Sequence, residues 1–213
     1  MSEALPSRRE ARRTENAQAI LNAALRLVAD KGDDFTTQEL IKEAGVALQT
    51  FYRHFGGKDQ LLLAVIEEMI TQHCQALEAR GVLLDTPVAR LHLYITASLQ
   101  ALEVGSGARF MTAQHWRLHQ VDSDAMTAAI KPFSDLVQRE LESGRAAGVL
   151  TPRDPANDAW LITKMVLAVF HHYAFSDGAV DVERVADDVW QFCLAGVGGD
   201  VPSRRRMSTR RRR

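Results

Sequence analysis

The stretch from Thr36 to Phe55 constrains the fold most, because two short helical patterns follow each other there with one tight turn between them. In its first four residues, "TTQE", Thr36 can cap backbone N–H groups while Glu39 reaches back to it, an arrangement called a capping box. The helix is expected to end at Ala44-Gly45, because glycine commonly takes the left-handed conformation that closes a helix. A second short helix then runs to about Phe55. The pattern predicts a helix-turn-helix.

The rest of the chain also follows a helical pattern. Apolar residues recur at helical spacing almost everywhere, and no segment shows the alternation that is typical of strands. The fold class is therefore expected to be all-α, with about nine helices. Their expected residue ranges are 15–30, 36–44, 48–55, 58–79, 87–103, 108–119, 123–147, 155–175 and 182–195.

Charge is distributed unevenly along the chain, although the net charge is only −1. Residues 60–203 carry 18 acidic and 10 basic side chains, whereas residues 204–213 carry seven arginines and no acid. A second basic cluster, "SRREARR", lies near the start. Basic ends on an acidic body favour a polyanionic partner, and solvated, disordered tails are the alternative interpretation.

Several classes of protein are excluded by what the sequence lacks. It has no run of 18 apolar residues, so neither a membrane span nor a membrane partner is expected. Its N-terminal arginines precede no apolar stretch, so no secretory signal is expected. Cys74 and Cys193 form no ligand pattern and are typical of reduced cytosolic thiols. We therefore expect a cytoplasmic protein.

No motif indicates an enzyme. The glycine-rich "GSG" and "GVGG" do not follow strands and are not nucleotide loops, and neither a Gly-x-Ser-x-Gly nor a His-Glu-x-x-His motif occurs. His115 and His119 stand four residues apart, as two metal ligands could. They lack a cysteine or carboxylate companion at the usual spacing, which favours ordinary helical histidines. We therefore expect no catalytic residue, no metal site and no cofactor.

The helix that ends near Phe55 is expected to have one apolar and one polar face. At about 3.6 residues per turn, Phe51 and Phe55 share the side that faces a small core. Amide and guanidinium groups can bond base edges, while phenol and hydroxyl groups can bond phosphates. Lys58 begins the next helix, where backbone N–H groups favour an anion. Binding to double-stranded DNA is therefore expected from the polar side chains Gln49, Thr50, Tyr52, Arg53 and His54.

The segment "TTQELIKEAGVALQTFYRHFGGKDQLL" resembles the DNA-binding module of the TetR family of transcriptional regulators. The resemblance covers about residues 15–75, and its turn, core and contact residues are Thr36, Leu40, Ala44, Gly45, Val46, Thr50, Tyr52, His54, Phe55, Lys58 and Leu61. Ala47 departs from the family, which usually has a serine there that caps the helix. By position, the resemblance implies phosphate contacts by Thr37, Tyr52 and Lys58. It implies contacts to bases or their phosphates by Gln38, Thr50, Arg53 and His54.

The resemblance also implies an organisation into regions. Residues 1–59 would form the DNA-binding domain with a basic N-terminal arm, and residues 60–197 a helical regulatory domain that binds a ligand and dimerises. Residues 198–213 would be a disordered, arginine-rich tail. The helix at 155–175 is apolar on most sides and the helix at 182–195 carries an apolar stripe, so two of each could form a four-helix homodimer interface. The alternative is that both helices are only core.

Candidate ligand-binding residues come from the middle helices, although a place in the core is the default for most of them. Their methionine, aromatic and histidine side chains would suit an apolar or amphipathic small molecule. The candidates are Leu99, Leu102, Phe110, Met111, His115, Phe133, Val137, Trp160 and His171.

The function favoured by these patterns is that of a repressor. It would bind a palindromic operator as a dimer, associate with the nucleoid, and leave DNA when a small-molecule effector binds. A ligand-independent regulator or activator is the alternative, and a small-molecule-binding enzyme or carrier a remote one. The intact polar face and the lack of a catalytic pattern favour the regulator.

Overall fold

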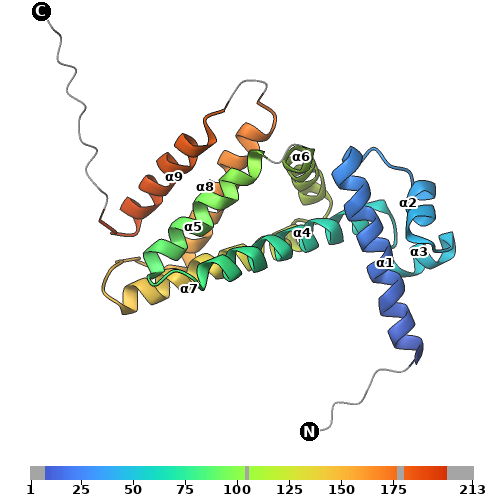
Figure 1. Cartoon of the computed structure of the whole chain (residues 1–213), viewed down its shortest axis with the longest axis horizontal. Helices are drawn as coiled ribbons and strands as arrows, with labels where there is room; N and C mark the ends of the chain where they lie inside the picture. The colour runs from blue at the N-terminus through green and yellow to red at the C-terminus, as the bar shows by residue number, and fades with distance from the viewer. Residues whose placement is uncertain (1–7, 104–105, 177–179, 201–213) are drawn as a thin grey trace, which may run out of the picture.

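A computed structural model describes residues 8–103, 106–176 and 180–200 of the chain. These residues form nine α-helices and one short 3-10 helix, and no strand, which confirms the all-α prediction. The helix-turn-helix lies at one end of the molecule and α9 at the other (Figure 1). The helices are α1 (Arg8–Lys31), α2 (Thr37–Ala44), α3 (Leu48–His54), α4 (Lys58–Gly81), α5 (Pro87–Gln100), η1 (Ala101–Glu103), α6 (Ser106–Val121), α7 (Ser123–Ala146), α8 (Pro155–Ala174) and α9 (Val182–Gly196).

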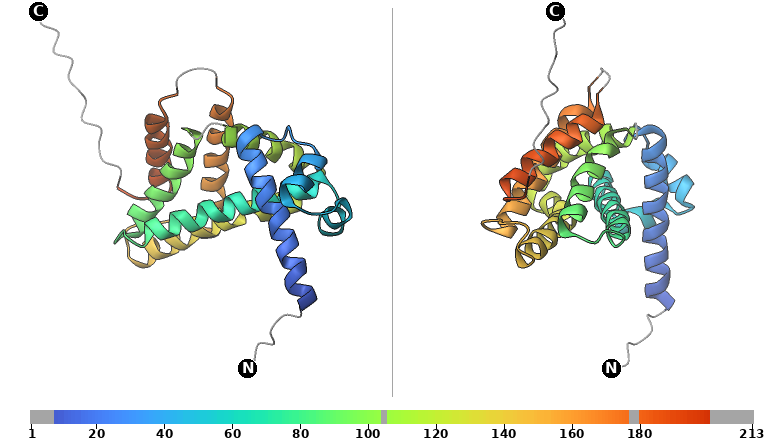
Figure 2. Two further views of the ribbon diagram at one scale, coloured as in Figure 1. Left: turned by 45° about the vertical axis from the view of Figure 1, so that its right-hand side comes forward. Right: turned by 60° about the vertical axis from the view of Figure 1, so that its left-hand side comes forward.

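Helix α1 begins earlier than the sequence pattern predicts. It starts at Arg8 instead of near residue 15, so the described part of the predicted basic arm is helical. Arginine, glutamate and alanine are good helix formers, which supports the extra turns. The extension carries no apolar stripe, and periodicity therefore could not reveal it. It projects past α2 and α3 (Figures 1 and 2).

The α2–α3 turn has the predicted geometry. Thr36 accepts a hydrogen bond from the backbone N–H of Glu39, and Gly45 closes α2 with a φ of 65°. A side chain at that φ would be strained, which explains the glycine. Ala47 precedes α3 without any side-chain cap, as its methyl group requires.

Two clusters of buried side chains hold the helices together. The first joins α1, α2, α3 and the first half of α4 to α6 and the start of α7; for example, Ile20, Phe51 and Ile66 pack in one cluster with Phe110 and Met126. The second fills the space between α4, α5, α7, α8 and α9. Helix α4 contributes to both clusters, so it crosses the boundary predicted near residue 59.

The far end of the molecule is closed by α9, which packs mainly on α5. The backbone N–H of Thr151 donates to the carbonyl of Val197 (2.8 Å), and that of Gly199 donates to Leu194 (3.0 Å). The first residues of the predicted tail are therefore held at the end of α9, and residues 201–213 lie outside the described residues. None of the described helices combines the length and the apolar character that crossing a membrane would need.

Candidate DNA-binding helix and apolar cavity

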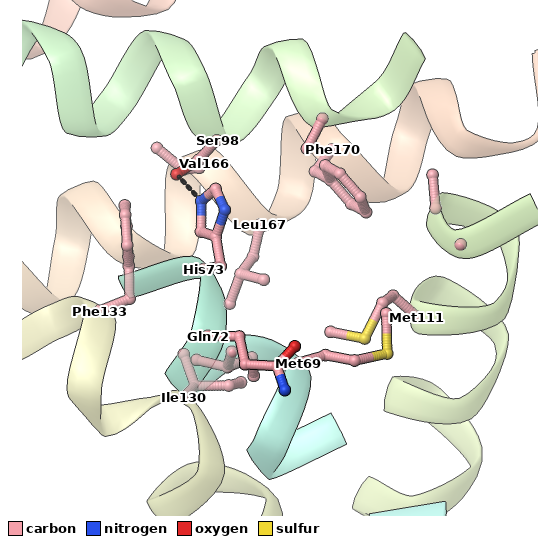
Figure 3. A pocket seen from close by; sticks show the side chains of 14 residues that line it. Met69, Gln72, His73, Ser98, Met111, Ile130, Phe133, Val166, Leu167 and Phe170 are labelled. Carbon is pink, nitrogen blue, oxygen red and sulfur yellow. Dashed lines mark hydrogen bonds between the residues drawn. The ribbon is translucent and has the colours of Figure 1, made fainter. Parts of the chain in front are cut away.

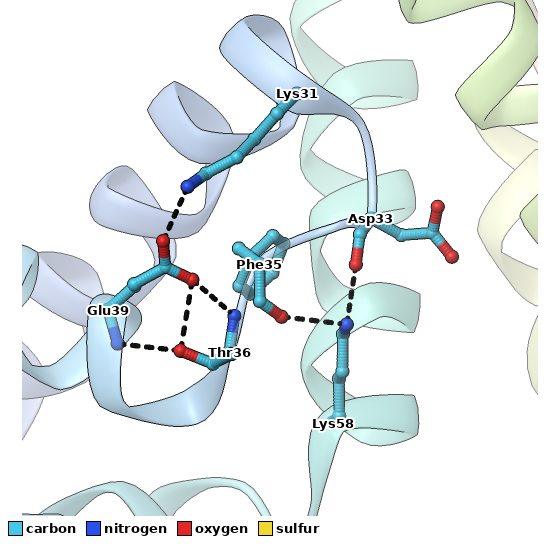
Figure 4. Close-up of polar contacts among 6 residues, drawn as sticks. All are labelled: Lys31, Asp33, Phe35, Thr36, Glu39 and Lys58. Atoms are coloured by element: carbon cyan, nitrogen blue, oxygen red, sulfur yellow. Dashed lines mark hydrogen bonds and ion pairs between the residues drawn. The ribbon is translucent and has the colours of Figure 1, made fainter.

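The start of α2 is fixed by a carboxylate that serves two partners (Figure 4). Glu39 accepts hydrogen bonds from the ammonium of Lys31 (2.6 Å) and from the backbone N–H of Thr36 (2.7 Å). The Lys31 bond first, and the Thr36 bonds after it, lower the pKa of Glu39 to about 2. Because the pKa of Glu39 is lowered, its hydrogen bonds stabilise the fold fully at pH values above the ordinary carboxyl range. That stabilisation is lost as the pH falls towards about 2. The cap is therefore intact at neutral pH.

Helix α3 has the two faces that its sequence predicts. Phe51 is 1% exposed in the first cluster, and the ring of Phe55 stacks on it with centroids 6.2 Å apart. Tyr52 is 54% exposed, and Gln49 and Arg53 are exposed as well. A helix surface of about one turn thus presents an amide, a phenol and a guanidinium to solvent.

The other flank of α3 is less open. Thr50 is half-buried and accepts a hydrogen bond from the Arg53 guanidinium (3.4 Å). His54 is half-buried too, and its Nε2 is buried without a partner among the described residues. Burial lowers the pKa of His54, and Arg53 and Arg13 of α1 lower it further. His54 is therefore held uncharged, and its contact with DNA stays a prediction.

On α2, the two predicted contact residues differ in exposure. Thr37 is the first residue of the helix and is half-buried, whereas Gln38 is exposed. Both lie in the first turn, whose free N–H groups suit phosphate oxygens.

Lys58 is engaged within the molecule (Figure 4). Its ammonium donates to the carbonyls of Asp33 (2.5 Å) and Phe35 (2.9 Å) and lies 4.7 Å from the centroid of the Phe35 ring. It thereby ties the start of α4 to the α1–α2 loop. Its contact with phosphate stays a prediction, since a bound phosphate would have to share this ammonium with two carbonyls.

Helix α6 is bonded directly to the segments that carry α2 and α3. The amide of Gln114 donates to the carboxylate of Asp33 (2.7 Å). Arg117 donates through Nε to Gln114 (2.8 Å) and through Nη1 to Asp59 at the start of α4 (2.7 Å). Sequence reasoning missed this network, because its partners are far apart in the chain and form no local pattern.

A cavity of about 480 Å³ lies between α4, α5, α6, α7 and α8 (Figure 3). Its lining is mostly apolar, with Gln72, His73 and Ser98 as the polar side chains. The full set of lining residues is Met69, Ile70, Gln72, His73, Ser98, Ala101, Gly107, Ala108, Met111, Ile130, Phe133, Val166, Leu167 and Phe170.

Of the nine predicted ligand-binding residues, Met111 and Phe133 line this cavity. The other seven lie elsewhere. Leu99, Phe110 and Val137 are buried in the two hydrophobic clusters, and Leu102 is half-buried away from the lining. Trp160 is 50% exposed on the outer side of α8, and His115 packs against His171 with ring centroids 4.7 Å apart.

Sequence reasoning missed the α4 side of the cavity. Met69, Ile70 and His73 share one side of α4 and point to the same space, but their spacing is also typical of ordinary core residues. Only the packing of α5 opposite α4 identifies His73 and Ser98 as neighbours.

The histidines between α6 and α8 form a separate group. Burial, followed by the effect of His171, His119 and Lys164, lowers the pKa of His115 to about 4. Burial also lowers the pKa of His171. Within residues 8–103, 106–176 and 180–200, no three histidine, cysteine or carboxylate side chains are grouped as metal ligands.

Comparison with known proteins decides the family. A model described as "Bacterial regulatory proteins, tetR family" matches residues 20–65, and one described as "Tetracyclin repressor-like, C-terminal domain" matches residues 84–197. The second match alone covers more than half of the chain. The chain belongs to the TetR family. As a TetR-family protein it is a transcriptional regulator, and the family is one of DNA-binding regulators rather than enzymes.

The curated relatives of this TetR-family chain match it over part of its length. The HTH-type transcriptional regulator BetI of Brucella anthropi is 31% identical over 83 residues, which are 38% of this chain and 43% of BetI. The HTH-type transcriptional regulator YvdT of Bacillus subtilis is 33% identical over 64 residues, 30% of this chain and 33% of YvdT. The matches thus span less than half of the length of these relatives.

Solved structures resemble the fold over most of its length. RolR in complex with resorcinol superposes with a TM-score of 0.71 at 21% identity, covering 90% of this chain and 92% of RolR. FadR of Bacillus subtilis in complex with stearoyl-CoA gives a TM-score of 0.67 at 19% identity, covering 84% of this chain and 98% of FadR. These likenesses show the TetR fold.

Proposed function

We propose that this TetR-family regulator is a repressor that binds a palindromic operator as a homodimer and leaves it when a small apolar or amphipathic molecule enters the cavity. One observation carries the proposal. Helix α6 contributes Met111 to the cavity, and Gln114 and Arg117, one to two turns later on the same helix, bond to Asp33 and Asp59 beside the helix-turn-helix. At about 1.5 Å per residue, Gln114 and Arg117 lie only about 4.5 and about 9 Å from Met111 along α6.

The exposed face of α3 supports sequence-selective DNA binding. Gln49 and Arg53 are exposed while Phe51 on the same helix is buried, which supports their entry into a major groove. Arginine can bond guanine and glutamine can bond adenine in bidentate fashion. The exposure of Tyr52 supports a contact between its phenol and the phosphate backbone.

The cavity supports an effector of modest size. Its volume falls within the range of about 300–1,000 Å³ that is usual for ligand pockets. Its lining of many apolar and few polar side chains is also typical of such pockets. Two proteins of the same fold carry resorcinol and stearoyl-CoA in their solved complexes, which supports a ligand role for this domain. Release from DNA requires that the ligand bind more tightly to a conformer in which the two α3 helices no longer fit successive major grooves.

Exposed apolar side chains on α8 and α9 support the homodimer. Trp160 and Leu161 are 50% and 49% exposed, and Phe192 on α9 is 66% exposed. Large apolar side chains that stay exposed on a folded chain are typical of an interaction surface when they form one patch. A second copy would cover them through a two-fold interface that uses the same residues on both sides.

The test is selection of bound sequences from a random pool of double-stranded DNA. We expect an inverted repeat whose half-sites are centred about 34 Å apart or a multiple of that spacing, because the two α3 helices must reach the same side of the duplex. A variant with Gln49→Ala and Arg53→Ala is the control and should enrich the repeat weakly or not at all. Recovery of the unselected base composition by the natural protein would contradict the proposal.

A further inference from the structure

The polar side chains of the cavity are arranged in a way that fixes the direction of each hydrogen bond. Ser98 Oγ lies 2.7 Å from the carbonyl oxygen of Tyr94 and 2.9 Å from Nε2 of His73. A carbonyl can only accept, and a hydroxyl has one proton to give. Both contacts are satisfied when Ser98 donates to Tyr94 and His73 Nε2–H donates to Ser98. His73 therefore carries its proton on Nε2.

The second ring nitrogen of His73 is then an acceptor. A neutral imidazole with its proton on Nε2 has a lone pair on Nδ1. Nδ1 lies on the side of the ring away from Ser98, where Phe170 and Met111 lie (Figure 3). Burial and the charge of Arg80 lower the pKa of His73, which keeps the ring neutral at physiological pH.

The rest of the lining offers no charge to a ligand. Apart from His73, none of the lining side chains is ionisable, and most are aliphatic, aromatic or thioether groups. An ionised carboxylate or phosphate placed here would lose its hydration without gaining a cation, which is strongly unfavourable. Met69, Met111, Phe133 and Phe170 provide polarisable surface that packs well against rings and chains.

We infer that the cavity takes an uncharged, largely apolar molecule that carries a hydroxyl group, and that this hydroxyl donates a hydrogen bond to Nδ1 of His73. The inference rests on the proposed function, because it assumes that the cavity is the effector site. His73 is the residue that selects a hydroxyl over an ether or a carboxylate, and Ser98 positions it by fixing the tautomer.

Three probes of nearly equal shape test this selection: para-butylphenol, its methyl ether para-butylanisole, and para-butylbenzoate. Binding to the full chain is measured by calorimetry at neutral pH. The phenol should bind about 3- to 10-fold more tightly than the ether, the range expected for one net hydrogen bond, and the benzoate should bind weakest.

Two variants and a control separate the role of His73 from general damage. His73→Phe keeps a ring but removes the acceptor, so phenol and ether should bind alike. Ser98→Ala frees the tautomer and should reduce the preference for the phenol. His92→Phe is the control, because His92 packs edge-on against Trp190 outside the cavity and its loss should leave the preference unchanged.

The outcomes distinguish the inference from the proposed function. Equal binding of phenol and ether by the natural chain, tightest binding of the benzoate, or a preference that survives His73→Phe would overturn the inference while leaving the cavity as a ligand site. Failure of all three probes to bind would overturn the inference and remove the cavity from the proposed function as well.

Discussion

Arg53 and Lys58 differ in the contacts that their side chains already make within the folded chain. Arg53 is exposed on α3, and its bond within the chain is a long one to Thr50 (3.4 Å). Lys58 has two carbonyl acceptors at 2.5 and 2.9 Å and an aromatic ring beneath it. The Arg53 guanidinium is therefore available to a base edge, whereas the Lys58 ammonium already stabilises the fold through its bonds to two carbonyls.

Replacing these two residues should have different effects on DNA binding. Arg53→Ala should relax the preference at one base pair in each half-site, by roughly 1–3 kcal/mol of discrimination. Lys58→Ala should weaken all sequences similarly and reduce the salt slope by about one. It should also lower the melting temperature, since the α1–α2 loop carbonyls lose their donor. The measurement is binding to single-base variants of the selected operator at two salt concentrations, together with thermal unfolding.

Either half of this prediction can fail by itself. If Lys58→Ala lowers the melting temperature but leaves the salt slope unchanged, Lys58 holds the loop and no phosphate. If Lys58→Ala reshapes the base preference while Arg53→Ala leaves it untouched, the assigned orientation of α3 on DNA is wrong.

At the scale of elements, α6 contacts both the cavity, through Met111, and the segments beside the helix-turn-helix, through Gln114 and Arg117. Its Arg117–Asp59 pair (2.7 Å) is partly exposed, so its contribution to overall stability is small. Its position matters more than its strength, because it joins α6 to the first turn of α4. Loss of the pair should therefore affect communication more than folding.

Arg117→Ala should separate ligand binding from DNA release. We expect a compound that stabilises the protein in a thermal-shift screen to bind the variant with little change in affinity, while its effect on operator binding shrinks several-fold. Arg139→Ala is the matched control, since the Arg139–Glu78 pair has similar exposure but joins α7 to α4 within the body. Equal loss of response in both variants would argue against a special role for α6.

The sequence predicted elements well where local chemistry decides them. Thr36, Glu39 and Gly45 define α2 by capping and by backbone conformation, and these effects act within a few residues. The first turns of α1 went unpredicted, because helix propensity without an apolar stripe leaves no periodic signal. The cavity was predicted only at Met111 and Phe133, because whether a buried side chain meets another side chain or empty space depends on how distant helices pack.

At the scale of the whole molecule, the exposed apolar side chains of α8 and α9 predict a dimer. Introducing a charge with Phe192→Glu, or with Trp160→Glu, should shift sedimentation at micromolar concentration from about twice the chain mass towards the mass of one chain. A buried glutamate facing its own copy across a two-fold axis is strongly unfavourable. Leu83→Glu is the control, since Leu83 is 82% exposed in the connection between α4 and α5 and belongs to neither α8 nor α9. A natural chain that sediments as a monomer would refute the prediction.

The first hydrophobic cluster has a consequence for how such a regulator can be recombined. A fragment cut at residue 59 would lack Leu61, Leu62, Val65 and Ile66, which fill the space beneath α1 and α3. A longer fragment that also contained these α4 residues would separate them from Phe110, Leu118 and Met126, which belong to the same cluster but lie in α6 and α7. The helix-turn-helix region is therefore not an independent folding unit. A hybrid with a different regulatory body must bring matching α6 and α7 side chains with it, or both halves lose part of one common core.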